Sequence, residues 1–206
     1  MGTRTLSSLE RDALREVASI GAGHAATALS QMTGARIMIN VPEVALLPLE
    51  RLGDLVGPPV TRVAAVTMRV MGDFTGTTVV AAEATAARAL CGMLLSRAVP
   101  PGGELDPMEA STLKETGNIL CSAYLNALSD FLGLMLLPSV PELVVGPVGR
   151  ALSREVLRVV GNDHPVFCVE TAFRIEGSER TQTAQFLLLP DPAALSVIFD
   201  AIRIAS

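Results

Sequence analysis

The chain has 206 residues, of which half are hydrophobic and 18% are charged, and its formal net charge is −5 at pH 7. This length fits one domain or two small fused halves, and the acidic balance argues against nucleic acid, whose phosphates attract a basic face. No basic leader precedes an apolar segment at the N-terminus, and no run of 18 residues is continuously apolar. We therefore expect a cytoplasmic protein without a signal peptide or membrane insertion.

The three cysteines, Cys91, Cys121 and Cys168, are odd in number and far apart in the chain. This pattern predicts small buried hydrophobic residues in a reducing compartment rather than disulfides or a zinc site. A nucleophilic cysteine is the less favoured alternative, because no partner histidine is indicated. We expect no metal ion held by this chain.

The first half of the chain is predicted to form a helix, a strand, a loop, a hairpin and a second helix. Ser7 and Glu10 have the spacing of a capping box, apolar residues then follow a helical period, and Gly34 is a left-handed stop. Pro42 places the following strand at an edge or marks its end. The later elements are predicted from the pattern of apolar and turn residues: a strand at 36–44, a loop at 49–60, hairpin strands at 63–70 and 76–82, and a helix at 84–97.

Three residues inside the first predicted helix need an explanation. Gly21 and Gly23 each cost roughly 1 kcal/mol relative to Ala, and close helix packing is the favoured reason, with close approach of a partner's backbone as the alternative. His24 has apolar surroundings in the sequence and is predicted to be a packed helix residue rather than a catalytic one.

The clearest break in the chain is the Pro- and Gly-rich stretch 99–103, and a second helix start follows it. Asp106 is predicted to be the N-cap, with Pro107 at the first helical position and Glu109 two residues further on. Two more hairpin strands are predicted at 166–174 and 183–189, and a closing helix at 190–204.

The second half repeats the first. Shifting the sequence by 99 positions superposes Ser7 on Asp106 and gives 12 identities over the 42 positions from 7 to 48, where chance would give roughly three. The identical positions in the first half are Glu10, Leu14, Glu16, Ile20, Ala28, Leu29, Ser30, Gly34, Val41, Pro42, Glu43 and Pro48. Later in the chain, residues 68–72 resemble 173–177. We infer a tandem duplication: one domain, 1–206, made of two repeats at about 7–98 and 106–205.

Each repeat reads helix, strand, hairpin, helix, so the predicted class is α+β. Direct hairpins favour a largely antiparallel sheet with helices packed on it. Two copies suggest a pseudo-twofold symmetric arrangement, with the first helix of each repeat exposed at an equivalent place.

The start of the second repeat carries the residues that we expect to do chemistry. Ser111, Glu115 and Asn118 are spaced by four and three, so a helix places them on one face and presents a carboxylate beside a carboxamide. Pro141 follows Asn118 after 22 intervening residues. An isolated Glu-x-x-Asn most often belongs to an ordinary exposed helix face, but here the stretch occurs twice, which favours a functional site.

The doubled pattern Asp/Ser-x₃-Glu-x₂-Asn-x₂₂-Pro, together with the stretch at 20–28, resembles the CheC family of chemotaxis proteins, whose relatives include CheX and the phosphatase portion of FliY. The resemblance covers essentially the whole chain. It implies a phosphatase that hydrolyses the aspartyl phosphate of the response regulator CheY. Many members of the family also bind CheD, a receptor glutamine deamidase.

In that family the glutamate binds the regulator's active-site lysine, and the asparagine holds a water in line for attack on phosphorus. The resemblance therefore implies Glu115 and Asn118 as the catalytic pair, with Ser111 and Pro141 as supporting motif residues. It implies no cofactor of the chain's own, because the phosphorylated regulator is expected to carry the magnesium ion. An amide suits this role since it offers both a donor and an acceptor to the water.

The first copy of the motif departs from the pattern. Asp12, Glu16 and Pro42 are in place, but Ser19 stands where asparagine belongs. Since serine is too short to reach where a carboxamide would, this degenerate first site is not expected to catalyse, although Glu16 could still dock a regulator.

Two other functions compete with the phosphatase. The first is a non-catalytic adaptor that binds CheD or the response regulator, which the lost asparagine of the first copy keeps open. The second is a flagellar switch component, which is disfavoured because no appended region is evident beyond the two repeats. The sequence indicates no residues for a CheD surface.

Overall fold

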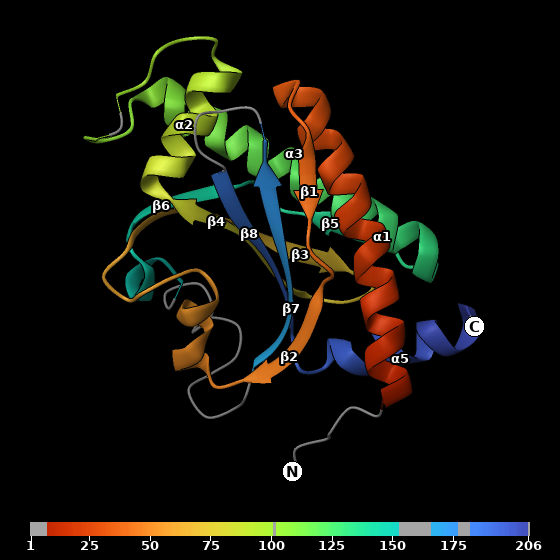
Figure 1. Ribbon diagram of the computed structural model, residues 1–206. Coiled ribbons are helices and arrows are strands. Elements are labelled where there is room, and N and C mark those ends of the chain that lie inside the picture. The colour runs from red at the N-terminus through yellow and green to blue at the C-terminus, as the bar shows by residue number, and fades with distance from the viewer. Residues whose placement is uncertain (1–7, 101, 153–165, 177–181, 206) are drawn as a thin grey trace.

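A computed structural model of the chain describes residues 8–100, 102–152, 166–176 and 182–205. One antiparallel sheet crosses the middle of the molecule, and the long helices α1 and α3 lie side by side on one of its faces (Figure 1). The predicted α+β class is confirmed.

The first half forms the elements predicted for it, with three differences, one of which is that the helix predicted at 84–97 ends at Leu94. Its elements are α1 Ser8–Thr33, β1 Ile37–Ile39, β2 Glu43–Leu47, η1 Leu49–Leu55, β3 Arg62–Gly72, β4 Gly76–Glu83 and α2 Ala84–Leu94. Gly34 ends α1 with a φ of 66°, as its left-handed stop predicts. The single strand predicted around Pro42 is two strands, because a proline has no N–H to continue the ladder. The predicted loop contains the 3-10 helix η1, and the predicted cap on Ser7 lies outside the described residues.

The second half repeats this order where the structure describes it. Its elements are α3 Pro107–Leu132, β5 Leu136–Pro138, β6 Glu142–Pro147, β7 Val166–Ile175, β8 Gln182–Pro190 and α5 Ala194–Ala205. The helix start at Asp106 and the second hairpin are confirmed. The closing helix begins at Ala194, four residues later than the predicted start at Pro190, because β8 continues to that proline.

The sheet is symmetric with respect to the two halves. Its eight strands run in the order β1–β7–β8–β4–β3–β5, with β2 also pairing with β7 and β6 with β3. Exchanging β1–β4 for β5–β8 leaves this order unchanged, so the duplication has produced the predicted pseudo-twofold arrangement. Its axis passes between β4 and β8.

The halves exchange strands across this axis. β1 and β2 pair with β7 of the second half, and β5 and β6 pair with β3 of the first. Each hairpin thus gains its outer neighbour from the other half, and a cut at the 99–103 connection would separate paired strands. The single domain and the boundaries of its two repeats stay predictions.

The strand register corrects one detail of the sequence alignment. Ile39 pairs with Phe173. Its counterpart under the 99-residue shift, Pro138, pairs with Val70. β7 therefore corresponds to β3 shifted by 103 positions (173 − 70), whereas the matched residues 68–72 and 173–177 imply a shift of 105. The two shifts differ by an even number, so each side chain still falls on the predicted face of its strand.

Apolar side chains are buried on both faces of the sheet. The larger core lies between one face and the helices, and includes Leu14, Leu29, Leu120, Tyr124 and Phe186. The smaller core lies on the other face, and includes Leu52 of η1, Val63, Val79, Val148 and Leu187. Within the described ranges, no helix is long and apolar enough to cross a membrane.

Candidate functional site

The helix that carries the complete motif, α3, has a well-defined start. The carboxylate of Asp106 accepts a hydrogen bond from the backbone N–H of Glu109 at 2.8 Å, and the Glu109 carboxylate accepts one from the N–H of Asp106 at 3.0 Å. Pro107 occupies the first helical position. This reciprocal capping box satisfies backbone donors that would otherwise lack a partner.

Ionisation of Asp106 strengthens this cap. The N–H of Glu109, and secondly the Arg97 guanidinium, hold the pKa of Asp106 below its ordinary value. A depressed pKa in the folded chain means that the stabilisation is complete above the unfolded-state value and is lost as the pH falls through the folded one. Acid therefore weakens the start of α3.

A buried ion pair ties the same end of α3 to α2. The guanidinium Nη2 of Arg88 lies 3.4 Å from Oε1 of Glu109, and the two side chains are only 9% and 3% exposed. Arg88 also donates to the backbone carbonyls of Gly102 and Glu104, and Arg97 adds a second contact to Glu109. Removing one partner of such a pair leaves an uncompensated buried charge, which costs roughly 3–5 kcal/mol.

The predicted row of motif residues lies on the outer face of α3. Ser111 and Glu115 are exposed and Asn118 is half-buried. In the part of the chain that the structure describes, neither the Glu115 carboxylate nor the Asn118 carboxamide has a side-chain hydrogen bond or ion pair. A carboxylate and an amide therefore stand one helical turn apart with their bonding capacity free for another molecule.

The inner face of α3 lies against the sheet at Gly117, between Glu115 and Asn118. A Cβ atom added to Gly117 would come within 2.6 Å of Cγ1 of Val66 on β3, closer than real Cβ contacts. Glycine is therefore required if the helix is to approach the strand this closely. The position of Asn118 relative to the sheet depends on this contact.

The spacing to Pro141 has a geometric explanation. The chain reverses at Gly133, whose φ is 65°, and β5 then lies alongside α3. From Leu132 back to Asn118 the helix covers about 21 Å at 1.5 Å per residue. From Leu134 to Pro141 an extended chain covers about 23 Å at 3.3 Å per residue. The two lengths nearly match, which explains why a gap of 22 residues can return the chain toward Asn118, and Pro141 is half-buried.

The first copy of the motif has the same outward row on α1. Asp12, Glu16 and Ser19 are all exposed, whereas Pro42 is buried between β1 and β2. The Ser19 hydroxyl donates to the backbone carbonyl of Arg15 at 2.8 Å. Its only donor is thus directed back along the helix, and the row offers a carboxylate without a neighbouring amide.

Large apolar side chains accompany both rows. Leu9 and Met108, which are 79% and 59% exposed, each lie three residues before the first member of their row and so share its face. Val41 and Val140, which are 72% and 81% exposed, directly precede the two motif prolines. Single exposed apolar residues are common, but repetition at equivalent places in both halves indicates contact surface.

Alternative chemistry finds little support in the described residues. There, no three His, Cys, Asp or Glu side chains are grouped so that they could hold a metal ion. Cys91, Cys121 and Cys168 are free and buried, as predicted. Burial raises the pKa of Cys91 and of Cys121 to about 11, and it raises that of Cys168 further, so none is poised as a thiolate nucleophile.

The predicted packing was wrong for two residues of α1, and two residues that position α3 were not predicted. Gly21 packs as predicted, since an added Cβ would lie 2.7 Å from Leu128 Cδ1, but Gly23 has nothing within 4 Å and His24 is exposed rather than packed. Gly117 and Arg88 were not identified. A glycine inside a helix and an arginine within an otherwise apolar helix were the available signals.

The fold and the doubled row define a pseudo-twofold α+β protein with two related helix faces. The CheC-like family matches at residues 9–46 and 108–145, which contain the two rows. A CheY-P phosphatase CheC from Bacillus subtilis is 32% identical over 196 residues, covering 94% of this chain and 93% of that protein. The chain belongs to the CheC-like family.

Solved structures are similar over nearly the whole chain. FliY from Thermotoga maritima superposes with a TM-score of 0.78 at 20% identity, covering 98% of this chain and 100% of that one. A CheX from Borrelia burgdorferi, crystallised with CheY, BeF₃ and magnesium, gives a TM-score of 0.58 at 13% identity over 84% of this chain and 96% of that one. At these identities the likeness shows the shared fold.

Proposed function

We propose that this chain hydrolyses the aspartyl phosphate of a CheY-type response regulator through Glu115 and Asn118 on α3. The observation that carries the proposal is the outer face of α3, where a carboxylate and a carboxamide lie one turn apart with no partner among the described side chains. The Bacillus subtilis relative, named a CheY-P phosphatase, supports the reaction class, and the solved CheX–CheY complex supports a receiver protein as partner.

The proposed reaction asks little of the chain beyond positioning. Water attacks phosphorus, the bond from phosphorus to the aspartyl oxygen breaks, and inorganic phosphate leaves while the regulator's carboxylate is restored. The Asn118 carboxamide accepts from and donates to its neighbours, so it holds the water in line without changing charge. Orientation of this kind lowers the barrier without a protonated catalyst. The regulator supplies the magnesium ion that neutralises the phosphoryl charge.

Glu115 acts in docking. Its exposed carboxylate pairs with the regulator's active-site lysine and sets the register of the complex, so that Asn118 arrives beside the phosphate. Met108 on the same helix face and Val140 beside Pro141 add apolar contact area. A surface that combines one charge with flanking apolar side chains suits a folded protein partner better than a small phosphorylated metabolite.

The proposal is tested by mixing the chain with phosphorylated regulator and timing the release of phosphate. Accelerated release that depends on Asn118 is the expected result. If the chain binds the phosphorylated regulator without accelerating phosphate loss, the adaptor function is correct instead. Co-elution with CheD examines the other adaptor partner. If the chain binds CheD, the complex should survive Asn118→Ala, because the catalytic face need not be the CheD face.

A further inference from the structure

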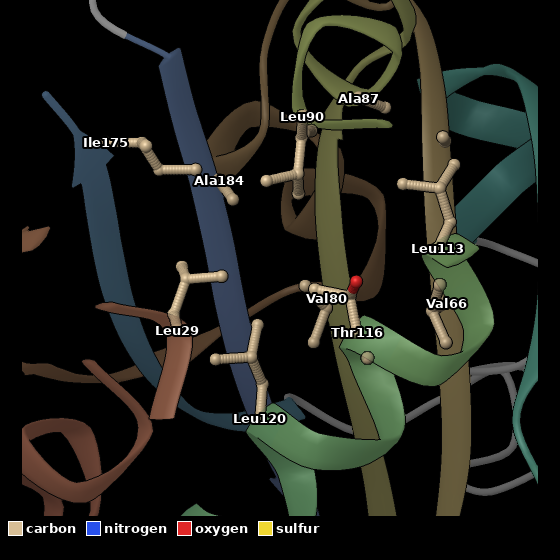
Figure 2. A pocket seen from close by; sticks show the side chains of 13 residues that line it. Leu29, Val66, Val80, Ala87, Leu90, Leu113, Thr116, Leu120, Ile175 and Ala184 are labelled. Carbon is tan, nitrogen blue, oxygen red and sulfur yellow. The ribbon is translucent and has the colours of Figure 1, made fainter. Parts of the chain in front are cut away.

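A cavity of about 40 Å³ lies beneath the motif helix, between α3, α2 and the helix-covered face of the sheet. Figure 2 shows Leu113, Thr116 and Leu120 of α3, Leu90 of α2 and Val80 of β4 arranged around this space. A cavity needs a volume of roughly 10–15 Å³ to hold one water molecule. The cavity is thus several times larger than a packing defect of atomic size.

Small residues leave this space open. Five of the elements that bound the cavity contribute a residue with little or no side chain: Ala64, Ala82, Ala87, Gly117 and Ala184. Protein interiors are normally packed as densely as organic crystals, so a space of this size is a departure from ordinary packing.

One residue of the cavity wall is matched by a larger residue in the other half of the molecule. The cross-strand pair Val66–Val80 corresponds, by the 103-residue shift of β3, to the pair Val169–Leu188, so leucine stands in place of Val80 while the other valine is kept. Val169 and Leu188 are both buried in the core.

The lining selects an apolar occupant. All its side chains are apolar except Thr116, whose hydroxyl donates to the backbone carbonyl of Thr112 at 2.8 Å. A buried water needs two to four polar partners, and this cavity offers no side-chain donor that is free. A hydrocarbon-like molecule replaces missing van der Waals contacts at no cost in hydrogen bonds.

We propose that this cavity is a binding site for a small uncharged apolar molecule, and that occupation of the site moves α3 and so displaces Glu115 and Asn118. The two ends of this coupling are one residue apart: Thr116 and Gly117 line the cavity, while Glu115 and Asn118 flank them on the outer face. A helix is rigid along its length, so a guest that presses on the inner face shifts the outer row with it. Any effect on phosphate release rests on the function proposed above.

Xenon under pressure serves as the probe of the full chain, because a single apolar atom suits a cavity of this volume, with nuclear magnetic resonance of ¹³C-labelled methyl groups as the readout. Saturable shifts are expected at the methyls of Leu113, Leu120 and Val66. No comparable shift is expected at Leu52, which lies in the core on the opposite face of the sheet. Absence of a saturable shift at the cavity methyls, or equal shifts at Leu52, would overturn the site.

A variant whose cavity is filled by a larger side chain tests whether the probe binds in the cavity. Ala82→Val adds two methyl groups in the cavity, whereas Ala172→Val makes the same change on β7, outside the lining. At least a tenfold loss of probe affinity is expected in Ala82→Val and none in Ala172→Val; wild-type affinity in Ala82→Val contradicts the assignment. Ala87→Leu on α2, where leucine is a good helix former, provides a second filled cavity should the strand variant fail to fold.

The coupling has its own readout, which does not depend on phosphatase activity. The side-chain NH₂ signals of Asn118 are expected to shift with the same probe dependence as the cavity methyls. Ser19, on the equivalent position of α1, is the internal reference, and its backbone amide is expected to stay unchanged. Filling of the cavity with no response at Asn118 would reject the coupling, whatever the chain does to phosphorylated regulator.

Discussion

α1 and α3 are two copies of one helix that the molecule uses differently. Both span 26 residues, both present an outward row with the same spacing, and both have an exposed apolar residue three positions before the row. They differ in the residue that would hold a water, which is Ser19 on α1 and Asn118 on α3. The proposed docking residues are thus present twice and the proposed water-orienting group once.

The two helices are also supported differently. α3 approaches the sheet at Gly117, where an added Cβ would contact Val66 of β3. Its counterpart on α1 is Ala18, and the close glycine of α1 comes three residues later, at Gly21, where the neighbour is Leu128 of α3 rather than a strand. Both helices contact the sheet, but the tightest glycine contact of α3 is with a strand and that of α1 is with the neighbouring helix. The position of the complete motif is therefore set by a close approach to β3 that α1 does not share at the equivalent residue.

The largest expected effect is a difference in phosphatase activity between a variant of the row on α3 and the matching variant of the row on α1. Asn118→Ala removes the only amide of either row and should lower the turnover of phosphorylated regulator by at least about tenfold, since orientation of the water is lost. Ser19→Ala on α1 should change turnover less than about twofold. Phosphate release at saturating regulator measures both, and affinity for a regulator carrying a phosphate analogue should fall less than turnover. Full activity of Asn118→Ala would end the proposed mechanism.

The different supports predict opposite responses to adding one methyl group. Gly117→Ala forces a Cβ to within 2.6 Å of Val66 and should destabilise the fold by about 1–3 kcal/mol. Gly23→Ala on α1 meets nothing within 4 Å and should stabilise by about 0.5–1 kcal/mol, as alanine does in an open helix position. Urea unfolding of the two variants gives both values. Equal changes in the two would show that Gly117 does not hold α3 against β3.

A smaller difference is expected from the two carboxylates. Glu115→Ala should weaken binding of the regulator by up to about fivefold, the size of one exposed ion pair, while turnover of the bound complex is largely kept. Glu16→Ala should have no effect on that catalytic complex. Titration calorimetry with analogue-bound regulator measures the binding, and single-turnover phosphate release measures the chemistry. A loss of turnover in Glu115→Ala without loss of affinity would reverse the assigned roles.

Features fixed within one helical turn or one hairpin could be predicted from the sequence. The capping box of Asp106 and Glu109 depends on atoms three residues apart, and the row Ser111, Glu115 and Asn118 follows from helical spacing alone. The repeat added the symmetry of the sheet, because two copies of one pattern must fold alike. These parts of the fold needed no knowledge of distant contacts.

Features that depend on distant contacts were missed. The alternation of apolar residues shows which face of a strand is buried but not which strand lies beside it. The pairing of β1 and β2 with β7 therefore could not be predicted. The partner of Glu109 is Arg88, which only the packing of α2 on α3 brings near. His24 was predicted to be packed because its neighbours in the sequence are apolar. It lies on the solvent-facing side of α1 and is exposed.

The smallest expected effect is a gain of activity on α1, and it examines whether Ser19 is all that the first row lacks. Ser19→Asn should give Asn118→Ala a measurable activity, below that of the wild-type chain because α1 lacks the close glycine contact with a strand that positions Asn118 on α3. The substitution breaks only the Ser19–Arg15 bond at an exposed position, so stability should change by less than about 0.5 kcal/mol.

The matched control is Ser19→Asp in the same Asn118→Ala background. Aspartate has the shape of asparagine but no N–H donor, so it should restore nothing if the water must accept a hydrogen bond as well as donate one. Adding Glu16→Ala to the Ser19→Asn variant should remove the gained activity, because the regulator then loses its register on α1. A chain in which Ser19→Asn restores nothing would show that the row on α1 lacks more than its amide.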